Sequence, residues 1–405
     1  MTEFQKNVLS LIHASLTDSE PRIEGKPDLM EIYRWADQQQ IVPLIYNGMM
    51  KVPALAEDPS SMLFFERTCV YIGHSADQTD TADRICAAFE EAGITHMPLK
   101  GTLLKSFYPS PEMRVMGDSD ILIKTEEYDR IVPIMESLGC TPNFESNHEY
   151  GWKTATGLQL ELHKRLIPSY NEDYYAYYGD GWRLTRTVEG CSYRYEMSPE
   201  DTFVYLFTHF AKHYRDQGVG IKYALDFFVF LRHYESLDIK RAEREMKRLQ
   251  LYDFYRNVMR MLRVWFEGEP SDDVTDLLTD KLFFDGVFGN AELNAVSEGL
   301  KMSKSTKSYR VKKVFQMMFP PSRTMRIKYP VLNTWAILMP IFWIVRLFDV
   351  VFIHRDRVRK QKDRLDRMSD ERVEQYRQQL NFVGLDYNFG EDDAPEPEGE
   401  AAEKP

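Results

Sequence analysis

The sequence predicts an α+β protein in which a small mixed β-sheet is flanked by helical regions on its N-terminal and C-terminal sides. Apolar residues recur at helical spacing early in the chain, as in "MEIYRWADQQQIVPLIYNGMM" (residues 30–50). From residue 94 the pattern changes to short apolar runs bounded by Gly and Pro, and after Pro199 the helical spacing returns. Strands that alternate with helices and then cluster indicate a compact unit with a mixed sheet.

We expect five segments along the 405 residues, a length that suits two or three packed units. They are an N-terminal helical region (1–84), a mixed-sheet core (85–197), a helical domain (198–300), a basic helical region with an apolar segment (301–380) and an acidic disordered tail (381–405). Disorder is expected because "EDDAPEPEGEAAEKP" (391–405) carries seven acids against Lys404 in a composition that cannot bury a core.

Each element of the core is predicted from its own residues. Helices are expected over "TADRICAAFEEAGI" (81–94), ending at Gly93, and over "TEEYDRIVPIMESLG" (125–139). The predicted strands are "ITHMPLK" (94–100), "SDILIK" (119–124), "CTPNFES" (140–146), "YGWKTAT" (150–156) and "LQLELHK" (158–164). Beyond the core, Ser198 or Asp201 can cap a helix that contains "FTHFAKHY" (207–214).

Two aspartates open the strand that follows "PEMRVMG". Asp118 and Asp120 are two residues apart, so in a strand they project from the same face, with Cα atoms about 6.5–7 Å apart. Two such carboxylates on a partly buried edge repel each other and raise one pKa, unless a cation lies between them. A hard divalent cation such as Mg²⁺ suits these oxygen ligands and keeps coordination positions open for phosphate.

A third acid lies in "LQLELHK", where leucines alternate with polar residues. Glu161 and His163 share the polar face of this predicted strand. If the strand lies beside the Asp118 strand, three carboxylates meet at one point and can hold a pair of metal ions over a reacting phosphate. His163 either orients Glu161 or contacts the acceptor, or it is a hydrogen-bonded structural histidine.

The segment "LKGT" provides a candidate phosphate site. The predicted strand ends at Leu99, Gly101 lets the backbone turn and approach a ligand, and a helix that begins near Thr102 offers backbone N–H groups. Lys100 adds a positive charge.

In this order, these motifs resemble those of an uncharacterised bacterial nucleotidyltransferase family within the DNA-polymerase-β-like superfamily. The resemblance rests on "PLKGTLLKSFYPSPEMRVMGDSDILI", "LELHKRL" and "FTHFAKHY" with "ALDFFVFL", and it extends from about residue 30 to 235. The chain departs from the common pattern at Thr102, where Ser or Gly is usual, and at Glu161, where Asp is frequent.

The resemblance implies transfer of a nucleoside monophosphate from an NTP to an acceptor hydroxyl, with release of pyrophosphate. It assigns Mg²⁺ or Mn²⁺ to Asp118, Asp120 and Glu161. Nucleotide-binding residues are then Lys100, Gly101, Thr102, Arg114 and His163. The acceptor hydroxyl belongs to a small molecule, a sugar or a protein; nucleic acid is less favoured, because no known RNA- or DNA-binding module is present.

The alternative function is a catalytically weak or inactive nucleotide-binding protein that acts as a scaffold or at a membrane surface. It is suggested by Thr102 and by the longer side chain of Glu161. In the helical domain, His209 and His213 have i, i+4 spacing, but Lys212 and Arg215 oppose a zinc ion. Contact with phosphate or base and packing between domains both remain open for this pair, and Asp226 is predicted to be a buried, paired carboxylate.

The apolar segment "VLNTWAILMPIFWIVRLFDVVFI" (331–353) has the length of a membrane span. Asn333, Pro340, Arg346 and Asp349 argue against a span, which leaves a buried helix as the favoured interpretation and an interfacial amphipathic helix as the alternative. Residues 301–365 contain sixteen Lys and Arg against three Asp, which fits peripheral contact with an anionic membrane through residues 324–362. Four cysteines without paired spacing, and an N-terminus unlike a signal peptide, predict a cytoplasmic location.

Overall fold

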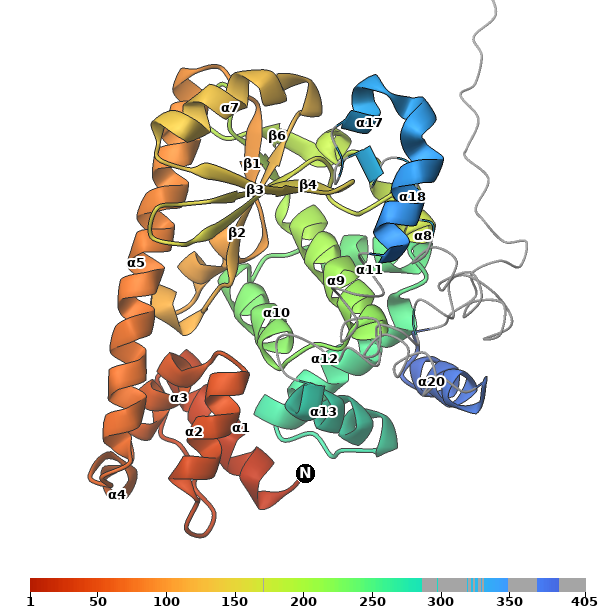
Figure 1. The fold of residues 1–405 in the computed structure, drawn as a ribbon. Coiled ribbons are helices and arrows are strands. Elements are labelled where there is room, and N and C mark those ends of the chain that lie inside the picture. Colours follow the sequence, from red (N-terminus) through yellow and green to blue (C-terminus); the bar gives the residue numbers. More distant parts are fainter. Residues whose placement is uncertain are drawn as a thin grey trace, which may run out of the picture.

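The computed structural model of the protein describes residues 1–169, 171–285, 331–348 and 370–385, with a few further positions between 297 and 329. Within these residues it is a mostly helical α+β structure around a five-stranded mixed sheet with helices on both sides (Figure 1). This confirms the predicted fold class. Residues 386–405 of the expected acidic tail, and much of the expected basic region at 301–380, lie outside the described residues.

The helices before the sheet build the N-terminal part of the core. They are α1 (Glu3–Thr17), α2 (Leu29–Gln38), α3 (Val42–Met49), α4 (Pro53–Ala56) and α5 (Ser61–Glu91). Thr2 caps α1 through a capping box with Gln5, and the Asp28 side chain accepts from two backbone N–H groups at the start of α2.

The longest helix, α5, runs along the side of the molecule from the N-terminal helices to the sheet (Figure 1). It begins at Ser61, well before the helix predicted over 81–94. The prediction began too late because the buried side of the helix includes the polar residues Thr68, Ser75 and Gln78, which interrupt the apolar periodicity. The expected segment boundary at residue 84 lies inside this helix.

The sheet contains the strands β1 (His96–Pro98), β2 (Asp118–Ile123), β3 (Thr141–Glu145), β4 (Glu149–Lys153) and β5 (Gln159–His163). Their order is β1-β2-β5-β4-β3, in which β2 and β5 are parallel and the other pairs are antiparallel. Each lies within or beside its predicted segment. The parallel pair aligns Asp120 with Glu161.

The two faces of the sheet meet different helices. Ile121 of β2 and Leu160 and Leu162 of β5 pack against α5 and α7 (Tyr128–Ser137) in one buried apolar cluster. Because strand residues alternate in direction, Asp118 and Asp120 lie on the opposite face. Short helices complete the core before α7: α6 (Lys100–Leu104), η1 (Lys105–Phe107), η2 (Pro111–Met113) and η3 (Thr125–Glu127).

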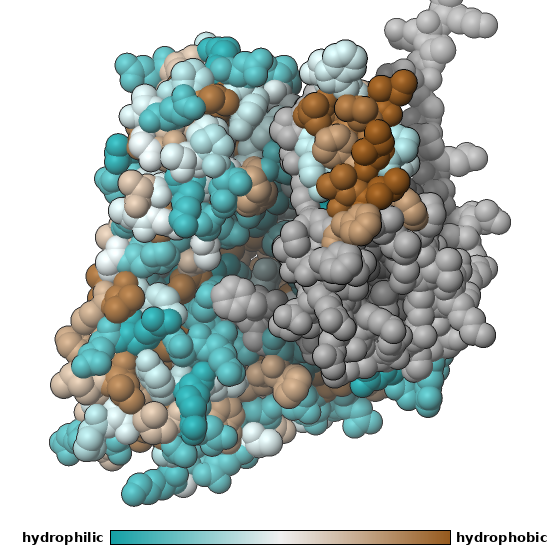
Figure 2. All heavy atoms as spheres, in the orientation of Figure 1, coloured by the Kyte–Doolittle hydropathy of each residue, from teal (hydrophilic) through white to brown (hydrophobic). Residues whose placement is uncertain are grey.

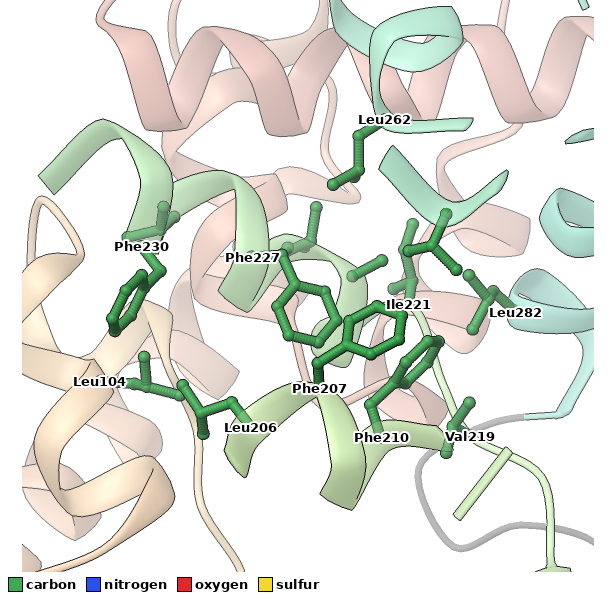
Figure 3. Close-up of a cluster of buried hydrophobic side chains, with 14 of the residues drawn as sticks. Leu104, Leu206, Phe207, Phe210, Val219, Ile221, Phe227, Phe230, Leu262 and Leu282 are labelled. Atoms are coloured by element: carbon green, nitrogen blue, oxygen red, sulfur yellow. The ribbon is translucent and has the colours of Figure 1, made fainter. Parts of the chain in front are cut away.

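A helical layer follows the sheet. It contains α8 (Glu172–Tyr178), η4 (Trp182–Leu184), the small strand pair β6 (Thr185–Thr187) and β7 (Tyr195–Met197), α9 (Pro199–Asp216), α10 (Lys222–His233), α11 (Ile239–Arg248), α12 (Tyr252–Phe266) and α13 (Asp273–Asp285). Ser198 caps α9, as expected. Aromatic side chains of α9 and α10, among them Phe207, Phe210 and Phe227, interdigitate at the centre of this layer and fix the two helices relative to each other (Figure 3).

The last described elements are α17 (Val331–Thr334), η5 (Ala336–Leu338), α18 (Met339–Phe348) and α20 (Asp370–Phe382). The favoured prediction of a buried helix over 331–353 is wrong for the outer face of η5 and α18, because Ile337 is 84% exposed and Ile341 is 56% exposed. Residues 349–353 of this predicted helix lie outside the described residues. Among the described residues, no helix is both long and apolar enough to cross a membrane.

Candidate active site

The predicted carboxylates lie on neighbouring parallel strands, on the face of the sheet that is not covered by α5 and α7. Asp120 stands opposite Glu161 in the register, and Asp118 projects from the same face of β2. Potential ligand atoms of Asp120, Glu161 and His163 all lie within 4.8 Å of one another. The strand adjacency that the sequence argument required is therefore present.

Asp118 carries the electrostatic signature of a crowded acidic site. Burial, together with the negative charges of Asp120 and Glu161, raises the pKa of Asp118 to about 6. Of the two aspartates in the Asp-x-Asp motif, Asp118 is therefore the one whose pKa is raised, as the expected repulsion requires of one of them.

Asp120 is instead surrounded by positive groups. Its Oδ1 accepts from Lys100 Nζ at 2.9 Å and from His163 Nε2 at 2.6 Å. Burial alone would raise the pKa of Asp120, but the charge of Lys100 and the hydrogen bond from His163 outweigh it and hold the pKa below its usual range. Asp120 is therefore ionised and fixed in position.

The backbone around Lys100 is shaped for close packing. Lys100 has a φ of 48°, in the left-handed region that non-glycine residues rarely adopt, at the turn between β1 and α6. A Cβ atom on Gly101 would lie 2.5 Å from Met116 Sδ, so the glycine lets α6 approach the loop before β2. Both residues line the cavity described below.

Thr102 has a different place from the other predicted nucleotide-binding residues. It does not line the cavity; its N–H donates to the Leu99 carbonyl at 3.2 Å, and its hydroxyl is buried. A phosphate contact from Thr102 would require this turn to open.

Arg114 lines the cavity but has a carboxylate partner. Its Nε and Nη2 donate to the two carboxylate oxygens of Asp226 at 2.6 and 2.7 Å, and Tyr108 donates to the same carboxylate at 2.8 Å. This pair confirms the prediction that Asp226 is a buried, paired carboxylate. It also ties the loop before β2 to α10.

A cavity of about 620 Å³ lies between the sheet face and helices α9 and α10. This volume is within the range of ordinary small-molecule sites. The predicted residues in its wall are Lys100, Gly101, Arg114, Asp118, Asp120, Glu161 and His163. The helical layer adds His209, Lys212, His213, Lys222, Tyr223, Asp226 and Phe227.

Two residues of the site, His148 and Glu149, were missed by the sequence analysis. His148 Nε2 lies 3.1 Å from His163 Nδ1, and Glu149 Oε2 lies 4.0 Å from the same nitrogen. Burial lowers the pKa of His148 to about 2, so its imidazole is neutral. Only the antiparallel pairing of β4 with β5, which places Glu149 opposite His163, brings them to the site.

On the far wall, His209 and His213 contact each other through their Nε2 atoms at 3.0 Å. Burial holds the pKa of each histidine well below its usual value, so both are neutral. Nearby, Lys222 donates to Gln40 Oε1 and to the Val115 carbonyl, and burial lowers its pKa to about 7. Lys222 could not be predicted from the sequence, since only the packing of α10 on the Val115 loop buries it.

Comparison with known families gives one match for this chain. Residues 25–267, more than half of the chain, match a family described as uncharacterised nucleotidyltransferase. The chain belongs to this family. The matched residues run from α2 through α12 and contain the whole wall of the cavity. The comparisons found no matching curated protein and no matching solved structure.

Proposed function

We propose that the protein transfers a nucleoside monophosphate from an NTP to an acceptor hydroxyl, with release of pyrophosphate. The observation that carries the proposal is the pairing of Asp120 with Glu161 on β2 and β5, with Asp118 on the same face of β2, at the wall of a nucleotide-sized cavity in a member of a nucleotidyltransferase family. The four free cysteines are compatible with the cytoplasmic location that we propose with it.

The residues fit a hard divalent cation. Carboxylate oxygens are its preferred ligands, and the charges of Asp120 and Glu161 add to burial in raising the pKa of Asp118, so a cation bound here would relieve their repulsion. Asp118, Asp120 and Glu161 would hold Mg²⁺ or Mn²⁺, which when bound would stabilise negative charge on the reacting phosphates. Both protein contacts of Asp120 fall on Oδ1, so a cation can bind Oδ2 while Lys100 and His163 stay in place.

The remaining residues position the triphosphate. Lys100 and Arg114 supply positive charge, and Gly101 lets the backbone approach the β- and γ-phosphates. The acceptor hydroxyl loses its proton to water or to a carboxylate of the site as its oxygen forms a bond to the α-phosphorus. The bond from that phosphorus to the bridging oxygen breaks, and pyrophosphate leaves. His163, held between Asp120 and His148, keeps Asp120 in a fixed orientation.

The acceptor would enter from the helical wall, where His209, His213 and Lys222 offer neutral or easily neutralised nitrogen groups. Such groups suit hydrogen bonds to hydroxyls of a small molecule, a sugar or a protein side chain. Nucleic acid is the less favoured acceptor.

A second candidate is nucleotide binding without turnover. It is favoured by Thr102, which does not line the cavity and whose N–H is bonded to the Leu99 carbonyl, and by the pairing of Arg114 with Asp226. In this case the protein would bind NTP and cation and act as a scaffold.

The test is to incubate the protein with labelled NTPs, Mg²⁺ or Mn²⁺ and cell extract, and to measure the label transferred to any acceptor. We expect transfer by the wild type and loss of transfer in Asp118→Asn/Asp120→Asn. The matched control, Glu126→Gln/Asp129→Asn, removes two exposed acids near the same strand and should retain activity. Equal incorporation by all three proteins would refute the transferase; nucleotide binding by calorimetry without incorporation would support the scaffold.

A further inference from the structure

The outer face of η5 and α18 exposes a continuous apolar surface. Ile341 and Ile344 are three residues apart in α18 and so lie on one side of this helix, and Ile337 in η5 precedes Ile341 by four residues. With their neighbours they form the brown patch on the upper part of the molecule in Figure 2, at the position of α17 and α18 in Figure 1. We call this set the α18 patch; its members are Trp335, Ile337, Ile341, Ile344 and Val345, all of which are exposed.

The inner side of α18 packs against a neighbouring part of the chain. Met325, Leu332 and Met339 form a small buried cluster, and Phe342 and Trp343 pack against it. Turning the α18 patch inward would bring these side chains out to water, so the exposure of the patch is fixed by the packing of the segment itself. A helix that is apolar on both sides is typical of a segment whose outer side also contacts an apolar partner or medium.

The charges of the flanking sequence indicate the chemistry of that partner or medium. The chain as a whole has a formal charge of −12, yet residues 301–365 carry sixteen Lys and Arg against three Asp. Residues 331–348 contain Arg346 and no acid, and Arg326 nearby in the chain is exposed. An apolar stripe with Trp at its edge, inside a basic stretch, is complementary to an anionic lipid surface, which presents both negative headgroups and hydrocarbon.

We infer that the α18 patch docks the protein on an anionic lipid bilayer, with α18 lying in the plane of the headgroups. The helix has 10 residues and is therefore about 15 Å long, half of the hydrocarbon thickness, which agrees with lying on a membrane rather than spanning it. This inference does not depend on the transfer reaction, because the α18 patch contains none of the residues of the cavity wall.

The test is flotation of the full chain with vesicles of phosphatidylcholine alone or with about 30% phosphatidylglycerol, at low and high salt. We expect binding to the anionic vesicles, weakened by salt, and little binding to neutral ones. Ile341→Ser/Ile344→Ser should weaken partitioning by about ten-fold or more without a change of charge. The matched control is Val70→Ser/Ile72→Ser, which removes two similarly exposed apolar side chains from α5.

The single variant Ile337→Ser repeats the test at the most exposed position of the patch, where loss of fold is not expected. Absence of wild-type binding to anionic vesicles would overturn the inference, as would equal loss in the α5 control. A concentration-dependent dimer that dissociates in Ile341→Ser/Ile344→Ser, without vesicle binding, would also overturn it and assign the patch to a second copy of the chain.

Discussion

Asp118 and Asp120 are neighbours on one face of β2, but they differ in how they affect folding. Asp118 has a pKa raised to about 6 by burial and by the nearby acids, while the pKa of Asp120 is lowered by Lys100 and His163. The free energy of unfolding therefore depends on pH in opposite directions at the two positions.

Asp118→Asn should stabilise the protein in the absence of divalent cations. The folded-state pKa lies above the ordinary value of 3.8, so the folded protein holds this proton more tightly than the unfolded chain. The resulting stability is present at low pH and is lost as pH rises through about 6. Because Asp118 is partly exposed, we expect a gain of only about 1–2 kcal/mol above pH 7 in urea unfolding. The gain should shrink toward pH 4; a variant less stable than wild type at pH 8 would contradict this account.

Asp120→Asn should have the opposite effect. The folded-state pKa of Asp120 is lowered, so its contribution to stability is present above the ordinary pKa and is lost as pH falls. Removing the carboxylate leaves the buried Lys100 ammonium without its partner, at a cost of about 2–4 kcal/mol at pH 7. Lys100→Met/Asp120→Asn should recover part of this loss in the same urea titration, and no recovery would show that the ion pair is not the cause.

At the scale of elements, the pair of Arg114 and Asp226 joins the loop before β2 to α10 across the edge of the cavity. Arg114→Met should destabilise the protein by about 3–5 kcal/mol, because the Asp226 carboxylate would remain buried with only the Tyr108 hydroxyl as a donor from this cluster. Arg114→Met/Asp226→Asn should be less destabilised than the sum of the single variants. Strictly additive losses would mean that the two side chains do not act as a unit.

The elements of the sheet could be predicted from sequence because each has a local signal. β5 alternates leucines with polar residues, and the structure buries Leu158, Leu160 and Leu162 while Glu161 faces the cavity. The start of α5 could not be predicted in the same way, since the polar residues on its buried side are buried only because they contact distant parts of the chain. Gln78, for example, donates to the Met116 carbonyl.

The residues of the site could likewise be predicted where they carry a local sequence pattern, but not where distant contacts bring them to the cavity. Asp118, Asp120, Glu161 and His163 carry a period-two pattern that strands convert directly into a shared face. His148 and Lys222 reach the cavity only through the β4–β5 pairing and the docking of α10, which are contacts between distant parts of the chain. Arg114 was predicted as a phosphate ligand, whereas its bond to Asp226 depends on a residue 112 positions later in the chain.

At the scale of the whole molecule, the cavity lies between two layers, the sheet with α5 and α7 on one side and α9 with α10 on the other. A ligand that contacts both layers binds only the folded protein, so it should raise the free energy of unfolding by mass action. The acidic wall comes from the sheet, and the nitrogen-rich wall comes from the helices. A cation alone should therefore bind to residues of the sheet, whereas a nucleotide with its cation should contact residues of both layers.

We expect Mg²⁺ with a non-hydrolysable NTP to raise the unfolding free energy by about 2.7 kcal/mol at a ligand concentration of one hundred times Kd. The effect should be larger at pH 8 than at pH 5, because protonation of Asp118 below about pH 6 removes a cation ligand. Asp118→Asn, although more stable without ligand, should lose most of this gain, and Glu126→Gln/Asp129→Asn should keep it. Equal stabilisation of Asp118→Asn and wild type would place the cation elsewhere, whether or not the protein turns over its nucleotide.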